Sequence, residues 1–209
     1  GGVARKGSEM KIAPFKLERY FARHEFSVRY LLCGSDCEAL SVRELTSLEA
    51  GGTGAGELMD LWLGYTESEG NPGLREEISK LYTDTPPEAI LVHTGAEEAI
   101  FIFMNAVLDR GDHVIVHWPS YQSLFEVAAS VGCDVTRWET REENGWELDL
   151  DFLKDHIQPN TRAVVVNCPH NPTGYHAAPE VFRELDRLAR KHGFVIFSDE
   201  VYRFMEYRP

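Results

Sequence analysis

The sequence predicts an α/β fold with a mainly parallel sheet and helices on both faces. Apolar runs of strand length alternate with longer helical stretches, which is the pattern of such a sheet. The predicted strands cover 90–93, 114–117, 135–138, 163–166 and 194–197, and the predicted helices cover 96–108, 120–131, 149–156 and 179–192. The composition agrees, because 43% apolar and 26% charged residues are ordinary values for a globular protein.

Shorter elements are predicted ahead of this alternation. Apolar residues spaced among charged ones over 15–26 indicate an amphipathic helix. Ser41 is predicted to cap a helix running to about Ala50, because Glu44 completes a capping box. A glycine-rich loop over 51–56 follows. It does not follow a strand, so its glycine spacing does not fit a dinucleotide-binding turn.

Charge and composition limit the partners. The chain has 21 Lys and Arg against 34 Asp and Glu, a net charge of −13, which disfavours nucleic acid. No apolar run approaches the roughly 20 residues of a membrane span, and residues 1–10 lack the apolar core of a secretory signal. We interpret residues 1–10 as an added tag. The four cysteines are too sparse for a disulfide scaffold, and Cys33 and Cys37 are interpreted as reduced packing residues of a cytoplasmic protein.

Two polar clusters follow predicted strands at the point where each strand ends. Asn171, in the string Asn-Pro-Thr-Gly, comes after the run 163–166, and Asp199 and Tyr202 come after the run 194–197. In open α/β sheets, ligands bind outside the carboxyl ends of the strands. An amide, a carboxylate and a phenol are therefore expected to converge on one flat polar ligand.

Two earlier strand–helix turns carry further candidates. Gly95, followed by Ala96 and Glu97, opens a predicted helix, and free amides at a helix N-terminus favour an anion, although any such turn can use glycine for its geometry. Tyr121 follows the run 114–117, where a flat ring can stack on a heteroaromatic cofactor or simply pack in the core. Trp118 is the alternative stacking residue.

Two other groupings are weaker. His113 and His117 are four residues apart, but that spacing on a strand does not focus a metal, and we interpret both as residues flanking the strand. Cys168 and His170 lie close together near Asn171 and can suggest a thiol nucleophile. Local packing is the interpretation we prefer for that pair.

From about Leu58 to its end, the chain resembles the fold type I pyridoxal phosphate enzymes, in particular the class I/II aminotransferases. The resemblance implies pyridoxal 5′-phosphate as cofactor, with the phosphate at Gly95, Ala96 and Glu97. It places Tyr121 against the pyridine ring, Asn171 and Tyr202 at the phenolic oxygen, and Asp199 at the ring nitrogen. A carboxylate there would keep the ring nitrogen protonated.

The same resemblance extends to the amino-terminal part. Tyr65 is expected to reach the phosphate of a neighbouring subunit, which implies a homodimer. Gly34 is matched to a glycine loop near the substrate, although its flanking residues depart from the usual form, and Asn171 is also expected near the substrate. Residues 11–50 would belong to a smaller domain, and residues 51–209 would form part of the large cofactor-binding domain of an aminotransferase.

The predicted function is therefore that of a pyridoxal phosphate-dependent aminotransferase that uses an amino acid and a keto acid. The family's Schiff-base lysine is expected to lie downstream of Pro209, so the catalytic residue is not assigned, and this chain alone is expected to be inactive. One alternative is a lyase or cyclase on the same scaffold, of the capreomycidine synthase type, which the stretch 15–26 faintly resembles. Another is a non-catalytic module that retains the fold.

Overall fold

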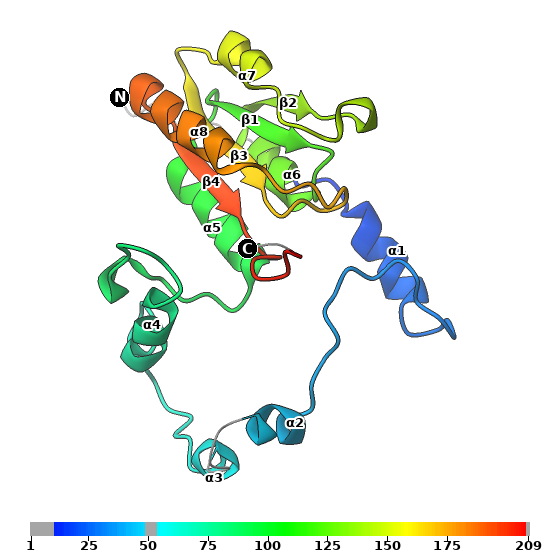
Figure 1. Ribbon diagram of the computed structural model, residues 1–209, viewed down its shortest axis with the longest axis vertical. Helices are drawn as coiled ribbons and strands as arrows, with labels where there is room; N and C mark the ends of the chain where they lie inside the picture. The colour runs from blue at the N-terminus through cyan, green and yellow to red at the C-terminus, as the bar shows by residue number, and fades with distance from the viewer. Residues whose placement is uncertain (1–10, 49–53, 208–209) are drawn as a thin grey trace, which may run out of the picture. The chain divides into compact units, whose positions relative to one another are not determined.

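The computed structural model describes residues 11–48 and 54–207, and Figure 1 labels their elements in chain order. Contacts within the chain divide them into two units. The sheet unit contains residues 11–17 and 94–207, and the amino-terminal unit contains residues 18–93. The predicted tag, residues 1–10, lies outside the described residues.

A four-stranded sheet forms the centre of the sheet unit. Its strands are β1 (His113–Trp118), β2 (Asp134–Glu139), β3 (Thr161–Asn167) and β4 (Val195–Asp199). They are all parallel and lie in the order β2-β1-β3-β4. The predicted α/β fold with a parallel sheet is confirmed, and four of the five predicted strands are present.

The prediction of a fifth strand over 90–93 is wrong. These residues are extended but pair with no strand in the described part of the chain. The amide of Val92 instead donates to the Glu69 carbonyl at 2.9 Å. An apolar run predicts an extended segment, but only a neighbouring backbone makes that segment a strand, and sequence periodicity carries no information about the neighbour.

Helices cover both faces of the sheet (Figure 1), as predicted. On one face, α5 (Ala96–Val107) and α6 (Ser123–Val131) pack against Val114 and Val116 of β1. On the other face, α7 (Leu150–His156) and α8 (Pro179–His192) pack with Ile115 and the fully buried Trp138. Side chains alternate between the two faces along a strand, and this alternation divides the apolar residues into two cores.

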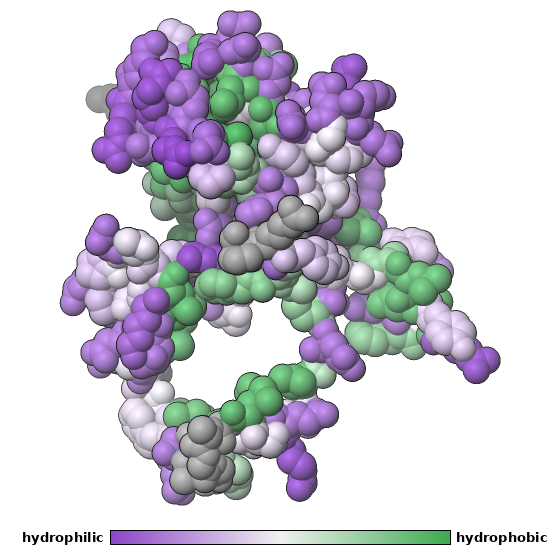
Figure 2. Space-filling model, viewed as in Figure 1, coloured by the Kyte–Doolittle hydropathy of each residue, from purple (hydrophilic) through white to green (hydrophobic). Residues whose placement is uncertain are grey.

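The sequence of α8 explains both its ends and its outer surface. Pro179 occupies the first turn, where its missing N–H costs nothing, and Gly193 ends the helix with a left-handed φ of 81°. Leu185 and Leu188 are buried beneath it. Figure 2 shows hydrophilic residues gathered over this helix, whose surface carries ion pairs such as Arg187–Glu184 and Arg190–Asp186.

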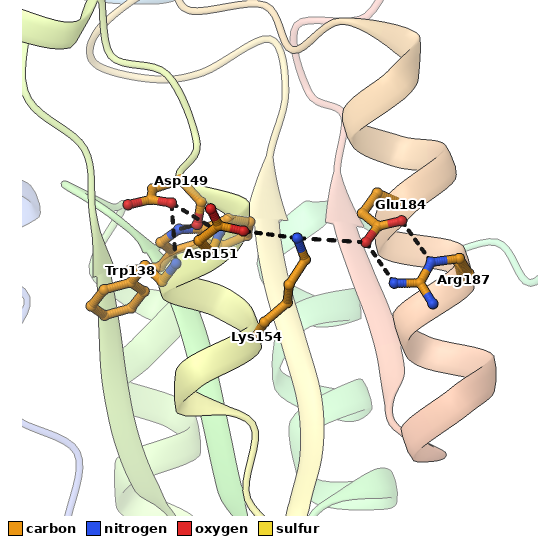
Figure 3. Close-up of polar contacts among 7 residues, drawn as sticks. Trp138, Asp149, Asp151, Lys154, Glu184 and Arg187 are labelled. Atoms are coloured by element: carbon orange, nitrogen blue, oxygen red, sulfur yellow. Dashed lines mark hydrogen bonds and ion pairs between the residues drawn. The ribbon is translucent and has the colours of Figure 1, made fainter.

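A polar network joins α7 to its surroundings (Figure 3). The Trp138 indole donates to the Asp149 carbonyl at 2.8 Å, and the Asp149 carboxylate caps α7. Lys154 of α7 lies 2.8 Å from Asp151 and 3.9 Å from Glu184 of α8. Because the Asp151 side chain is 87% exposed, these ion pairs add little stability beyond the apolar contacts between the two helices.

The amino-terminal unit contains short helices, and none of its described residues is buried. Its helices are α2 (Val42–Ser47), α3 (Gly54–Met59), α4 (Pro72–Ser79) and the 3₁₀ turn η1 (Pro87–Ala89), while α1 (Lys16–His24) begins in the sheet unit. The capping box of Ser41 and Glu44 is confirmed, and Ala50 lies outside the described residues. The loop predicted over 51–56 is wrong at its end, because α3 begins at Gly54.

None of the helices within residues 11–48 and 54–207 is both long and apolar enough to cross a membrane.

Candidate functional site

The two polar clusters meet at the carboxyl edge of the sheet. Strands β3 and β4 run side by side, with Asn167 paired to Asp199 at their ends. Just beyond them, the Asn171 side-chain amide donates to the Tyr202 hydroxyl at 3.2 Å. The structure therefore brings an amide and a phenol, 31 positions apart in sequence, into direct contact beside the strand end that carries Asp199.

Asn167 holds this arrangement together, and the sequence reasoning missed it. Its side-chain amide donates to the Asp199 carbonyl at 3.0 Å, while its Oδ1 accepts the Asn171 backbone N–H at 2.7 Å. Asn167 is 4% exposed, so both bonds are shielded from water. A polar residue directly after the apolar run 163–166 was the available signal, because a buried amide must find partners.

Asp199 is half-buried at the end of β4. Burial raises the pKa of its carboxyl above the ordinary value, the neighbouring Glu200 carboxylate raises this pKa further, and the Val201 amide partly offsets both effects. That amide donates to Asp199 Oδ1 at 3.1 Å. A desolvated carboxylate gains most from a cationic partner, which suits Asp199 to face a protonated ring nitrogen.

The turn before α5 presents backbone amides with little side-chain cover. No side chain in the described part of the chain caps the helix at Gly95, and a Cβ built there would meet none of the described atoms within 4 Å. The Glu97 carboxylate accepts from the Ser123 hydroxyl at 2.9 Å. The Glu98 carboxylate accepts from the Thr94 amide at 2.6 Å.

The aromatic candidates of the next turn differ in their surroundings. Phe15 packs edge-on against Tyr121, with ring centroids 4.7 Å apart and an interplanar angle of 73°. Trp118, the alternative stacking residue, is already engaged, since the Arg137 guanidinium lies 4.0 Å from its ring centre and Phe125 packs against it at 5.0 Å. The stacking role of Tyr121 stays a prediction.

Gln122 fastens the segment that carries Phe15. Its side-chain oxygen accepts the Lys16 backbone N–H at 3.0 Å, and its side-chain nitrogen donates to the Pro14 carbonyl at 3.1 Å. A single amide therefore binds the backbone on both sides of Phe15. This contact joins residues more than 100 positions apart, so sequence periodicity gave no sign of it.

The histidines and thiols near Asn171 are structural. His113 and His117 are both buried within β1 and do not flank the strand as predicted. The His117 ring stacks on His170 with centroids 3.7 Å apart. Burial raises the pKa of the Cys168 thiol, which argues against a thiol nucleophile. Cys33 and Cys37 are exposed, so their predicted packing role is wrong. Among the described residues, no group of three or more His, Cys, Asp and Glu side chains can hold a metal ion.

The remaining candidates belong to the other unit. Gly34 and Tyr65 belong to the amino-terminal unit, where the Tyr65 side chain is 99% exposed. Their assignments stay predictions. A cavity of about 600 Å³ lies beside α7, and its lining contains none of the predicted site residues. Its walls are formed by Asn144, Glu147, Leu148, Asp149, Leu150, Asp151 and Lys154.

Known proteins resemble this chain in both sequence and fold. The profile of the family "Aminotransferase class I and II" matches residues 52–209. The aspartate aminotransferase of Geobacillus stearothermophilus is 36% identical over 151 residues, covering 68% of this chain and 38% of that enzyme. The glutamate-pyruvate aminotransferase AlaA of Escherichia coli is 34% identical over 145 residues, covering 66% of this chain and 36% of that enzyme.

Solved structures agree with the sequence matches. A PLP-dependent aminotransferase from Streptococcus suis superposes with a TM-score of 0.84 at 35% identity, covering 92% of this chain and 52% of that one. The Thermus thermophilus aspartate aminotransferase with maleate gives a TM-score of 0.67 at 36% identity, covering 70% and 40% of the two chains. The chain thus spans between about a third and a half of the length of these relatives.

Proposed function

Because this chain belongs to the class I and II aminotransferase family, we propose that it forms the cofactor-binding part of a pyridoxal phosphate-dependent aminotransferase acting on an amino acid. The observation that carries the proposal is the contact of Asn171 with Tyr202 beside Asp199, at the ends of two adjacent parallel strands.

The family membership implies pyridoxal 5′-phosphate, and the groups present fit its chemistry. A phosphate needs N–H donors, which the turn at Gly95, Ala96 and Glu97 offers at the start of α5. A protonated ring nitrogen needs a carboxylate, which Asp199 supplies with a raised pKa. A phenolic oxygen needs donors, and the amide of Asn171 and the hydroxyl of Tyr202 lie together.

When bound, pyridoxal phosphate supplies an electron sink for negative charge at the α-carbon of an amino acid. The residues of this chain would keep that sink effective. Asp199 would stabilise a proton at the ring nitrogen, because its half-buried carboxylate pairs favourably with a cation. Asn171 and Tyr202 would donate to the phenolic oxygen. Tyr121, which Phe15 contacts, would offer its ring for stacking.

The substrate and the assembly are part of the same proposal. The reaction would consume an amino acid and a keto acid, as the names of the aspartate, prephenate and glutamate-pyruvate enzymes suggest for those relatives. We also propose a cytoplasmic homodimer in which the exposed Tyr65 reaches the neighbouring site and Gly34 lies near the substrate. Residues 11–50 would belong to its smaller domain, and residues 51–209 to its large domain.

Replacement of Asp199 in the full-length protein tests the proposal. Asp199→Ala should slow half-transamination of an amino acid by about two orders of magnitude or more, the usual effect of losing one group that stabilises developing charge. Asp151→Asn is the control and should leave turnover unchanged, because it removes a carboxylate of α7 that is 87% exposed. Undiminished turnover in Asp199→Ala would contradict the assigned role. Product formation without a keto acid acceptor would indicate a lyase or cyclase instead.

A further inference from the structure

We infer that His170 is a positioning residue that fixes the Asn171 turn to the loop carrying Tyr121. Its Nε2 lies 2.8 Å from the Pro119 carbonyl oxygen, and its Nδ1 lies 2.7 Å from Thr173 Oγ1. His170 precedes Asn171 directly, and Pro119 lies two positions before Tyr121. One side chain therefore connects two loops 51 positions apart, each of which carries a residue of the proposed site.

The partners of the ring assign its tautomer. A carbonyl oxygen can only accept, so Nε2 carries the hydrogen and donates it to Pro119. Nδ1 is then the acceptor for the Thr173 hydroxyl, whose oxygen in turn accepts the Tyr175 amide at 3.2 Å. A neutral ring with hydrogen on Nε2 uses every donor and acceptor in this chain of bonds. Burial lowers the pKa of His170, which favours the same neutral form.

Packing holds the ring in its plane. His170 is 3% exposed, and the His117 ring stacks on it with an interplanar angle of 17°. Neither ring nitrogen of His117 has a hydrogen-bond partner within the described ranges, so His117 contributes a flat surface and no competing bond. His170 also makes two backbone bonds within its own turn, to Tyr175 O at 2.9 Å and from Gly174 N at 2.8 Å. The turn is thus rigid, and the bond to Pro119 sets its place relative to the Tyr121 loop.

The inference rests on the proposed function to the extent that Tyr121 and Asn171 are to contact one ligand. Two substitutions in the full-length protein separate the bond to Pro119 from the rest of the side chain. His170→Gln places an amide nitrogen near the position of Nε2, where it can donate to Pro119. His170→Asn places its shorter amide near Nδ1, where it can reach Thr173 but not Pro119.

Fluorescence titration of the apo protein with pyridoxal phosphate measures the outcome. His170→Gln should bind within about threefold of the wild type, and His170→Asn should bind about tenfold more weakly, the range of one lost hydrogen bond. Equal weakening in both variants would overturn the inference. Thermal unfolding of both variants checks that they fold.

Nitrogen-15 NMR of the wild-type histidine rings provides a test that needs neither variant nor ligand. At pH 7.5, His170 should carry hydrogen on Nε2 alone. Hydrogen on Nδ1, alone or in a cationic ring, would overturn the inference even if the variants bind as expected. If the wild type does not bind pyridoxal phosphate, the proposed function fails, and the tautomer still decides whether His170 makes the bond to Pro119.

Discussion

His117 should make the folded protein sensitive to mild acid, and removing it should relieve that sensitivity. The residue is 1% exposed, and neither ring nitrogen has a partner in the described part of the chain. Burial, and after it the adjacent His170, lowers its pKa from 6.5 to about 3. The native ring therefore stays neutral at a pH where an unfolded histidine is charged.

The sign and size of the effect follow from proton linkage. Below pH 6.5, His117 is protonated in the unfolded chain but stays neutral in the native state. The free energy of unfolding therefore falls as the pH falls, until the pH nears about 3. From pH 7.5 to pH 5 this one group should remove about 2 kcal/mol of stability. Above pH 6.5 its contribution to the pH dependence vanishes.

The substitution His117→Phe keeps an aromatic ring for stacking on His170 and removes the two buried nitrogens. Urea unfolding of the wild type and the variant at pH 7.5 and at pH 5 gives four free energies. The stability lost between these two pH values should be smaller in the variant by about 2 kcal/mol. Replacement of the exposed His176 by Asn is the control and should leave the loss unchanged. An equal loss in His117→Phe and the wild type would refute the reasoning.

Three further predictions concern other contacts. Asn167→Leu should lower the free energy of unfolding in urea by about 2–4 kcal/mol, because it breaks two buried hydrogen bonds; a loss below about 1 kcal/mol would contradict this. Burial and nearby aspartates raise the pKa of Cys133 to about 11, so at pH 8 a thiol reagent should label the exposed Cys33 and Cys37 first. Gln122→Ala removes the two hydrogen bonds to the backbone of Pro14 and Lys16, and it should speed tryptic cleavage after residue 16 by about tenfold. An unchanged cleavage rate would show that these bonds do not hold the segment in place.

Short sequence patterns predicted the site residues that directly follow a strand. Asn171 and Asp199 each follow an apolar run, and parallel strands bring their carboxyl ends to one edge, so their approach could be expected from the sequence. The capping box at Ser41 was equally local. Each of these features depends on residues within a few positions of one another, or on the direction of a strand.

The contacts that the sequence did not reveal join distant segments. The Gln122 bond to Pro14 and the His170 bond to Pro119 depend on which loops the strand order of the sheet makes neighbours. The burial of His117 depends on α8 and its preceding loop covering that face of the sheet. The wrong strand prediction over 90–93 has the same cause, because the apolar residues of that segment do not specify a pairing partner.

The strand order has a consequence for how the site is made in the cell. The central strands β1 and β3 are separated in the chain by β2 and two crossover helices. They can therefore pair only after β3 has left the ribosome. Asp199 and Tyr202 emerge later still, at the end of β4 and in the turn beyond it. A nascent chain therefore presents the turns of Gly95 and Tyr121 before the carboxylate of Asp199, so the proposed site cannot be complete before β4 has been made.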